Sequence, residues 1–311
     1  MRKHNRVNAI SEPNARAAAE GAGASGDNSG PDFLGVGAQK AGTSWLYEQL
    51  WAHPDFWMPP VKGLHYFNRP TRPERIRARP VEFERRRNAK RRVKARDERD
   101  LRFLDAMEAL YARAEIDWSG YAALFAPKGS LLSGDVTPAY STLQDEMIDS
   151  IVAHFPPVKA IFLARDPVER AWSQLSLMMR HGTIDAFDAT DFREVKSKLL
   201  LPDLQLRSYP SQIVSRWRRH LPPSQFRVYF FDDLQSEPAS LRHSIIEFLG
   251  GDPLKPSGDV QAEQNSKATQ EKLKLTPDVQ DRLAAFFEEE LKACARELDG
   301  PAAAWPGRYK L

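Results

Sequence analysis

The stretch GVGAQKAGTSWLYEQL, from Gly35 to Leu50, decides the fold predicted for this chain. It begins within a short apolar run, Phe33 to Val36, and leads into apolar residues at helical spacing. This pattern predicts a strand, a tight glycine-rich loop and a helix. The backbone N–H groups of Gly42, Thr43 and Ser44 would point at a phosphate or sulfate, and the helix dipole would favour its negative charge. We therefore expect an anion site at this loop.

The position of the lysine separates this loop from an ATP-binding P-loop. The Walker A pattern, G-x-x-x-x-G-K-[ST], places its lysine directly after the second glycine. Here Gly42 is followed by Thr43 and Ser44, and Lys40 lies two places before Gly42. This displacement argues against ATP hydrolysis, so a nucleotide or small-molecule kinase remains only an alternative.

A second stretch, VKAIFLARDPVERAWSQLSLMMRHG, runs from Val158 to Gly182. Its first six residues are almost wholly apolar, as in a central parallel strand, and Pro167 stands where a helix over 168–180 would begin. Arg165 lies just past the predicted strand and Ser173 two turns into the predicted helix. These two side chains can hold the same phosphate, because arginine offers a bidentate grip.

Together the two stretches resemble the sulfotransferases that use 3′-phosphoadenylyl sulfate (PAPS). The loop fits their 5′-phosphosulfate pattern G-x-x-K-x-G-T-[ST], and residues 165–173 match every fixed position of R-[DN]-P-x-[ED]-R-A-x-S, which binds the 3′-phosphate. The resemblance implies an α/β fold: a P-loop-like three-layer sandwich with a central parallel sheet flanked by helices. It implies no metal, and donor contacts from Lys40, Ala41, Gly42, Thr43, Ser44, Trp45, Arg165 and Ser173. Glu169 and Arg170 are expected to form surface or capping pairs.

Other segments extend the resemblance over most of Asp32 to Trp305. Lys62 to Phe67 is similar to the family's K-E-x-H-[FY]-F segment, and Leu131 to Tyr140 to its [EG]-[EDK]-x-[TS]-P-x-Y segment. Gln264 to Lys267 resembles the loop that closes over the adenosine and 3′-phosphate, which adds Lys267 to the donor site. Beyond these segments we expect helices at 209–220, 238–249 and 276–298, and a strand at 226–231.

The catalytic base is where this sequence departs from the heparan-type relatives. Their catalytic Glu is replaced here by Gly63, whereas His65 is kept and Asp135 stands where their second motif has Glu. We predict His65 as the general base, since an imidazole with an unperturbed pKa of about 6.5 suits proton abstraction near neutrality. Asp135 would orient it or serve as an alternative base. The replacement of the catalytic Glu by Gly63 weakens the case for heparan-like substrates.

The composition of the chain predicts its cellular compartment and the number of its domains. The chain has 311 residues with 41% hydrophobic content, a single cysteine, Cys294, and no apolar run near the roughly 20 residues of a membrane helix. A reducing cytoplasm is therefore expected. Residues 1–30, rich in Ala, Gly, Ser and Asn, have no signal-peptide pattern and are predicted to be a disordered tail before one domain at 31–311.

A basic insert interrupts the domain at about 71–115. Between Arg72 and Arg99 there are 13 Lys and Arg against five Asp and Glu. Glu82 to Leu110 lacks Pro and Gly and is predicted to be one helix, polar all round in its first half. The insert is either a solvated excursion or a lid that attracts an anionic acceptor or another acidic partner. Without interleaved aromatic residues it gives no reason to expect nucleic acid.

The leading hypothesis is a soluble, bacterial-type, PAPS-dependent sulfotransferase. Its acceptor would be a small-molecule, glycan or lipid-linked hydroxyl or amine, and Lys40 would stabilise the departing 5′-phosphate. The alternatives are the kinase and a catalytically idle PAPS-fold protein that binds anionic partners through the insert. Neither the acceptor nor the oligomeric state can be read from the residues.

Overall fold

The computed structural model describes residues 30–69, 81–113, 115–258, 260–264 and 273–311, with backbone alone at 81–86. The predicted tail at 1–30 lies almost wholly outside these ranges, as do the start of the basic insert and Lys267. No helix in the described part of the chain combines the length and apolar character needed to cross a bilayer.

A four-stranded parallel sheet forms the centre of the fold. Its strands are β1 (Phe33–Gly37), β2 (Gly134–Val136), β3 (Lys159–Ala164) and β4 (Phe226–Phe230), in the spatial order β2-β1-β3-β4. All three strand pairs are parallel. Every residue of β1 is buried, as expected for a strand covered on both faces. The strands expected near 33–36, 158–163 and 226–231 are thereby confirmed.

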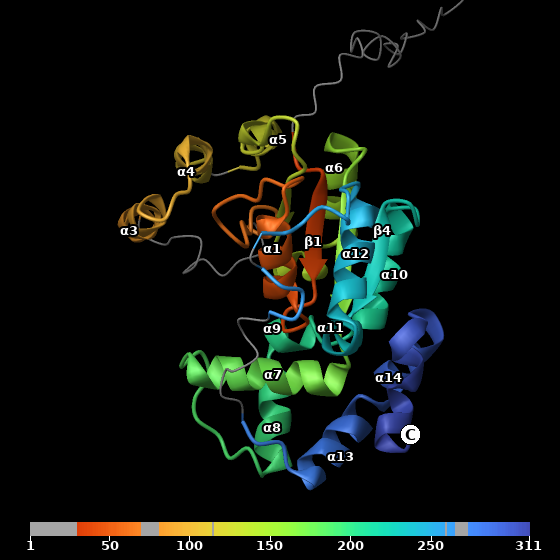
Figure 1. The fold of residues 1–311 in the computed structure, drawn as a ribbon. Helices are drawn as coiled ribbons and strands as arrows, with labels where there is room; N and C mark the ends of the chain where they lie inside the picture. The colour runs from red at the N-terminus through yellow and green to blue at the C-terminus, as the bar shows by residue number, and fades with distance from the viewer. Residues whose placement is uncertain (1–29, 70–80, 114, 259, 265–272) are drawn as a thin grey trace, which may run out of the picture.

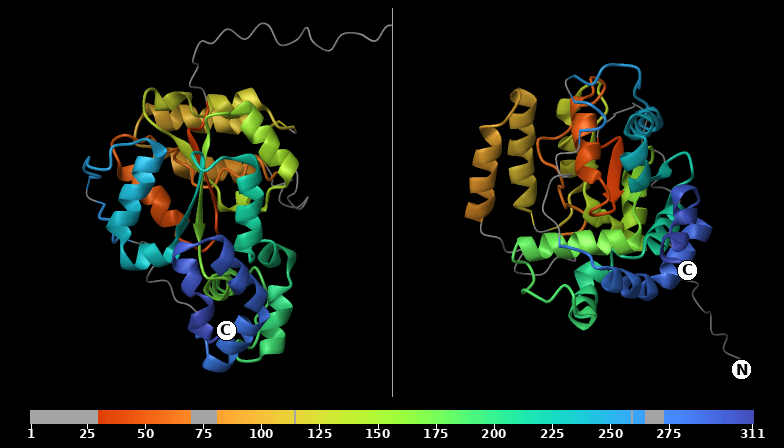
Figure 2. Two further views of the ribbon diagram at one scale, coloured as in Figure 1. Left: turned by 90° about the vertical axis from the view of Figure 1, so that its right-hand side faces the viewer. Right: turned by 60° about the horizontal axis from the view of Figure 1, so that its bottom comes forward.

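Helices cover both faces of the sheet and make the fold a three-layer sandwich. Figure 2 shows α1 (Thr43–Ala52) and α12 (Pro238–Leu249) on one side and α6 (Asp145–His154) and α10 (Pro210–His220) on the other. The predicted α/β fold class is therefore confirmed. Each strand is followed by a helical segment, so the carboxyl ends of the strands meet at one edge, where ligands gather in such sheets.

A group of helices closes that edge. Figure 1 shows α7 (Pro167–Arg180) crossing just beyond the arrowhead of β1, with α13 (Pro277–Phe286) and α14 (Glu288–Glu297) farther from the sheet. The remaining elements are α5 (Trp118–Ala123), α8 (Phe192–Leu199), α9 (Pro202–Gln205), α11 (Phe231–Ser236), η1 (Ala126–Lys128), η2 (Pro138–Thr142), η3 (Gly300–Ala304) and η4 (Pro306–Tyr309). The single helix predicted at 276–298 is wrong in one respect, because the buried Phe287 separates α13 from α14.

The described part of the basic insert is a helical hairpin, and the continuous helix predicted from Glu82 to Leu110 is wrong. The two helices are α3 (Val81–Arg92) and α4 (Glu98–Tyr111). Asp97 caps α4 by accepting hydrogen bonds from the backbone N–H groups of Arg99 and Asp100, at 2.9 and 3.4 Å. An N-cap aspartate starts a new helix at this point, although neither glycine nor proline marks the break.

Candidate active site

The loop of residues 38–42 connects the carboxyl end of β1 to α1. Gly42 is the N-cap of α1 with φ 95°, and a Cβ added there would lie 2.6 Å from Leu234 Cδ2. Both the backbone conformation and the close contact require glycine. Because Gly42 has no side chain to cap the helix, the first-turn N–H groups remain available to an anionic ligand.

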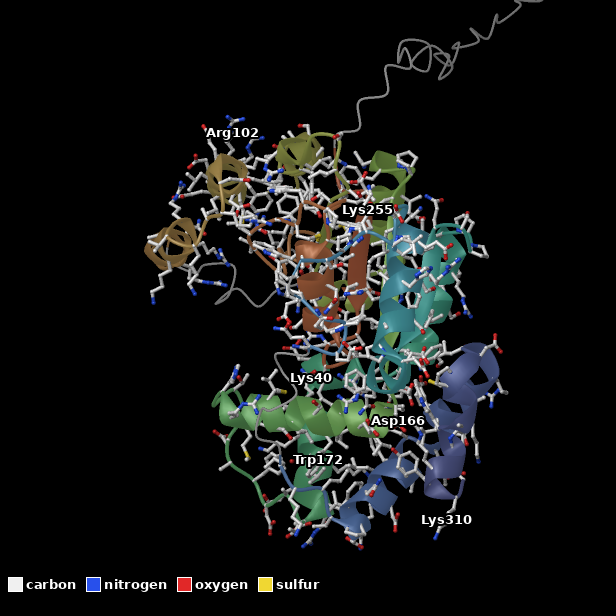
Figure 3. All side chains as sticks on the ribbon, in the orientation of Figure 1. Lys40, Arg102, Asp166, Trp172, Lys255 and Lys310 are labelled. Carbon is white, nitrogen blue, oxygen red and sulfur yellow. The ribbon has the colours of Figure 1, made fainter. Side chains whose placement is uncertain are left out.

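A cavity of about 490 Å³ opens beside this loop. Its walls are the loop and start of α1, the segment 62–65, the start of η2, one face of α7, and single residues near α9 and α11. In Figure 3, Lys40 lies between α1 and α7. The predicted site residues that line this cavity are Lys40, Gly42, Thr43, Ser44, Trp45, His65, Arg165 and Ser173.

Two predicted site residues, Ala41 and Asp135, do not line the cavity. Ala41 is fully buried and its N–H donates to the carbonyl of Ala38, so it shapes the loop without lining the cavity. Asp135 is 1% exposed and is likewise absent from the cavity wall. Lys267 lies outside the described residues, and its role remains a prediction.

Arg165 joins the two predicted nucleotide motifs. Its Nη1 donates to the carbonyl oxygen of Lys40 at 2.8 Å, and its Nη2 to Glu169 Oε2 at 3.0 Å. The guanidinium also lies 4.2 Å from the ring centroid of Phe231. These three contacts fix Arg165 at the cavity, on the same side as Ser173, because an arginine with two hydrogen-bonded partners and a ring beneath it has little rotational freedom.

Lys62 is a cavity residue that the sequence reasoning did not select. Its Nζ donates to Ser44 Oγ at 2.9 Å and to Thr43 Oγ1 at 3.3 Å, so a second ammonium group stands at the start of α1. Its place at the head of the segment that resembles K-E-x-H-[FY]-F was the signal that could have identified it.

The expectation that Arg170 forms a surface or capping pair is wrong. Its side chain is fully buried and donates to Ser208 Oγ at 2.6 Å and to Gln174 Oε1 at 3.2 Å. Burial, with the nearby guanidinium groups of Arg207 and Arg165, lowers the pKa of Arg170 to about 9. The wall behind the cavity therefore carries a cation whose hydrogen-bond partners, Ser208 and Gln174, are neutral.

Arg207 is a further cavity residue that no motif indicated. Its Nη1 donates to Gln39 Oε1 at 2.8 Å, which holds the guanidinium beside the residue that precedes Lys40. Burial lowers the pKa of Arg207. Among the described residues that line the cavity, five are Lys or Arg, two are His, and none is Asp or Glu. The lining of the cavity is therefore strongly cationic.

His65 and Asp135 belong to one hydrogen-bonded unit at the end of β2. The His65 backbone N–H donates to Thr137 Oγ1 at 3.3 Å, and this hydroxyl donates to Asp135 Oδ1 at 2.6 Å. Asp135 also accepts from Tyr140 at 2.6 Å and from Tyr121 at 3.1 Å. Burial raises the pKa of Asp135. With its oxygens occupied inside the protein, Asp135 is placed to hold the His65 segment, and its position argues against direct proton abstraction.

The backbone gives a reason for Gly63 where heparan-type relatives have Glu. Gly63 has φ 77°, and a Cβ added there would lie 3.4 Å from His65 Nε2. His65 itself has φ 58° and Lys40 φ 73°, so two non-glycine residues of the cavity adopt a left-handed conformation. Such conformations are concentrated at functional sites. A carboxylate side chain at position 63 would be strained by this backbone conformation.

The fold and the cavity define an α/β protein with a cationic cavity between the glycine-turned start of α1 and Arg165, at the end of the neighbouring strand β3. The family comparison makes this more specific. The sulfotransferase family model matches residues 31–254, and the chain belongs to this family.

Solved structures show the same fold. A sulfotransferase from Alicyclobacillus acidocaldarius is 21% identical with a TM-score of 0.58, over 88% of this chain and 98% of that one. The sulfotransferase domain of the Synechococcus PCC 7002 olefin synthase is 15% identical with a TM-score of 0.50, over 92% and 97% of the two chains. A comparison with curated proteins gives no match. At these identities the structural similarity concerns the fold alone.

Proposed function

We propose that this protein transfers a sulfuryl group from PAPS to a hydroxyl or amine of a small-molecule, glycan or lipid-linked acceptor, releasing 3′,5′-ADP, a reaction of the EC 2.8.2 type. The observation that carries the proposal is the hydrogen bond from Arg165 to the Lys40 carbonyl. It brings the loop that resembles the phosphosulfate motif and the helix that resembles the 3′-phosphate motif to one cavity.

The chemistry of the cavity residues fits both ends of such a donor. The amide groups at the start of α1, with Lys40 and Lys62, suit a phosphosulfate, because oriented N–H dipoles and ammonium groups stabilise fixed negative charge. Arg165 and Ser173 suit a phosphomonoester, which accepts a bidentate guanidinium and a hydroxyl. Trp45 offers an aromatic wall, and Lys267 is a further proposed contact.

When bound, PAPS supplies an activated sulfuryl group, and its departure leaves negative charge on the 5′-phosphate. Lys40 and Lys62 are proposed to stabilise that charge, since preorganised donors in a site shielded from water are worth more than in bulk solvent. His65 is proposed to accept the proton of the attacking hydroxyl or amine. Asp135 acts through Thr137 and the His65 backbone, and is a positioning residue.

The proposal is tested by incubating the full chain with labelled PAPS and a panel of alcohols, phenols, amino sugars and lipid-linked glycans. Release of 3′,5′-ADP that depends on the acceptor, with the label in the product, is the expected result. Phosphoryl transfer from Mg-ATP under the same conditions would support the kinase instead. Tight binding of 3′,5′-ADP without turnover of any acceptor would favour the idle binding protein.

A further inference from the structure

Arg207 lines the cavity, although it belongs to neither of the two stretches that resemble nucleotide motifs. Its Nη1 donates to Gln39 Oε1 at 2.8 Å. Nη1 of Arg165 donates to the carbonyl oxygen of Lys40, also at 2.8 Å. Gln39 and Lys40 are consecutive residues. The same short part of the loop is therefore held by two guanidinium groups that come from different parts of the chain.

The residue after Arg207 fastens this segment to α7. Ser208 Oγ accepts a 2.6 Å hydrogen bond from Nη2 of Arg170, which is fully buried on α7. Ser173 lies three residues farther along that helix, and residues at this spacing are neighbours on one helix face. Burial lowers the pKa of Arg170, and the nearby charges of Arg207 and Arg165 lower it further. Independent contacts therefore place Arg207 on the same wall as Arg165 and Ser173, the residues proposed to bind the 3′-phosphate.

The protein neutralises this group of arginines only in part. Arg207 pairs with the carboxylate of Asp203 at 3.5 Å, on a side chain that is 76% exposed. Arg165 pairs with Glu169 at 3.0 Å, on a side chain that is 38% exposed. Carboxylates exposed to water are screened and compensate a neighbouring guanidinium weakly. The guanidinium groups of Arg165, Arg170 and Arg207 thus outnumber the carboxylates that pair with them in the described part of the chain.

A phosphomonoester matches this excess of positive charge. Its second pKa is about 6, so near neutral pH it carries a charge of about −1.5 to −2, with three oxygens that accept hydrogen bonds. Guanidinium groups bind such oxygens, and in a wall shielded from water their charge acts over several ångströms. A free 3′-hydroxyl is neutral and would leave the excess charge unbalanced. The wall therefore suits a nucleotide that carries a 3′-phosphate.

We infer that Arg207 is a specificity-determining residue for the donor: it binds the 3′-phosphate beside Arg165 and Ser173, and it makes the protein select nucleotides with this group over nucleotides with a free 3′-hydroxyl. The inference rests on the proposed function, because it adds a residue to the proposed PAPS site. The 3′-phosphate takes no part in sulfuryl transfer. Arg207 therefore acts on the binding of the nucleotide and is not a catalytic residue.

Two nucleotides that differ only in the 3′-phosphate test the inference. Calorimetric titration of the full chain and of R207Q gives the dissociation constants of 3′,5′-ADP and 5′-AMP, and their ratio measures the preference for the 3′-phosphate. We expect R207Q to lower this preference at least about tenfold, as the loss of a charge-assisted hydrogen bond predicts. R207M keeps the aliphatic stem and should show the same loss, so the test does not depend on the folding of one variant. R207K keeps the charge and should retain more of the preference.

The affinity for 5′-AMP separates recognition of the 3′-phosphate from a structural role. If Arg207 only held the loop through Gln39, its replacement would weaken both nucleotides alike, because both carry the 5′-phosphate that this loop is proposed to bind. R193Q is the matched control and should leave both constants unchanged, because Arg193 is 92% exposed and does not line the cavity. An unchanged ratio in R207Q or R207M would overturn the inference alone. Failure of the wild type to bind 3′,5′-ADP would overturn the proposed function as well.

Discussion

The guanidinium of Arg165 donates a 2.8 Å hydrogen bond to the backbone carbonyl of Lys40, a residue 125 positions earlier in the chain. The bond joins the end of β3 to the loop after β1, and these strands are neighbours in the sheet. A charged donor shortens and strengthens such a bond. The distance between the two predicted nucleotide motifs is therefore fixed by the protein before any ligand binds.

Lys40→Ala should reduce kcat with PAPS by about 10²- to 10³-fold, the effect of removing one donor that stabilises developing charge. The fold should persist, because Lys40 lines the cavity and does not belong to the buried core. Single-turnover kinetics and circular dichroism check both parts. A variant with the normal rate would exclude Lys40 from catalysis.

Lys62→Ala should lower kcat/KM for PAPS by about tenfold or more, since its ammonium group holds the hydroxyls of Thr43 and Ser44 and adds charge at the start of α1. Lys255→Ala is the matched control: Lys255 pairs with Asp55 at 2.7 Å and does not line the cavity. Steady-state kinetics should show the loss in the first variant only. Equal rates in both would remove Lys62 from the site.

His65→Asn should lose most of the turnover at every pH from about 6 to about 9 while binding 3′,5′-ADP normally, because the loss concerns proton abstraction and not the donor clamp. Isothermal titration with 3′,5′-ADP and rate measurements on the same preparation separate the two effects. Full activity across this range would assign the base to the acceptor or to another residue.

Gly42→Ala should destabilise the protein and weaken 3′,5′-ADP binding. The residue has φ 95°, and a Cβ would lie 2.6 Å from Leu234 Cδ2. Gly250→Ala separates the two costs, because Gly250 has nearly the same backbone conformation, φ 100° and ψ 13°, and its added Cβ would meet only Lys159 Nζ at 3.9 Å. We expect about 1 to 2 kcal/mol of backbone strain for Gly250→Ala and a larger loss for Gly42→Ala. Urea denaturation measures both, and equal losses would show that the Leu234 contact relaxes.

Asp166 at the start of α7 should make stability fall as pH rises. Burial raises its pKa to about 6, above the value of an unfolded chain. The folded state therefore binds the proton more tightly. The stability from this group is fully present below about pH 4 and is lost as pH rises from about 4 to about 6, by on the order of 2 to 3 kcal/mol.

Asp166→Asn tests this directly, because an amide oxygen can still accept the hydrogen bond from Val168 N–H, at 2.9 Å in the wild type. The free energy of unfolding of the variant minus that of the wild type should increase between about pH 4 and about pH 6 and stay level above. Chemical denaturation across this range provides the values. A difference independent of pH would mean that Asp166 titrates normally.

Local pattern was sufficient for most of the elements but not for two helices. Strands β1 and β3 were predicted because a short apolar run that is followed by glycine or proline is typical of a buried strand. The long helix through Asp97 was predicted wrongly, since an aspartate inside a polar helix looks the same in sequence whether or not it caps. Only the hydrogen bonds to Arg99 and Asp100 show the new start.

By itself, the sequence determined the fold class and identified the two stretches that resemble nucleotide-binding motifs, because periodicity and glycine, proline and lysine spacing act over a few residues. Tertiary structure alone decided which side chains share the cavity. It buried Asp135 under three hydroxyls, placed Lys62 on Ser44, and set Arg207 beside Gln39. The contacts of Lys62 and Arg207 join residues 18 and 168 positions apart, and such packing leaves no periodic signal in the sequence.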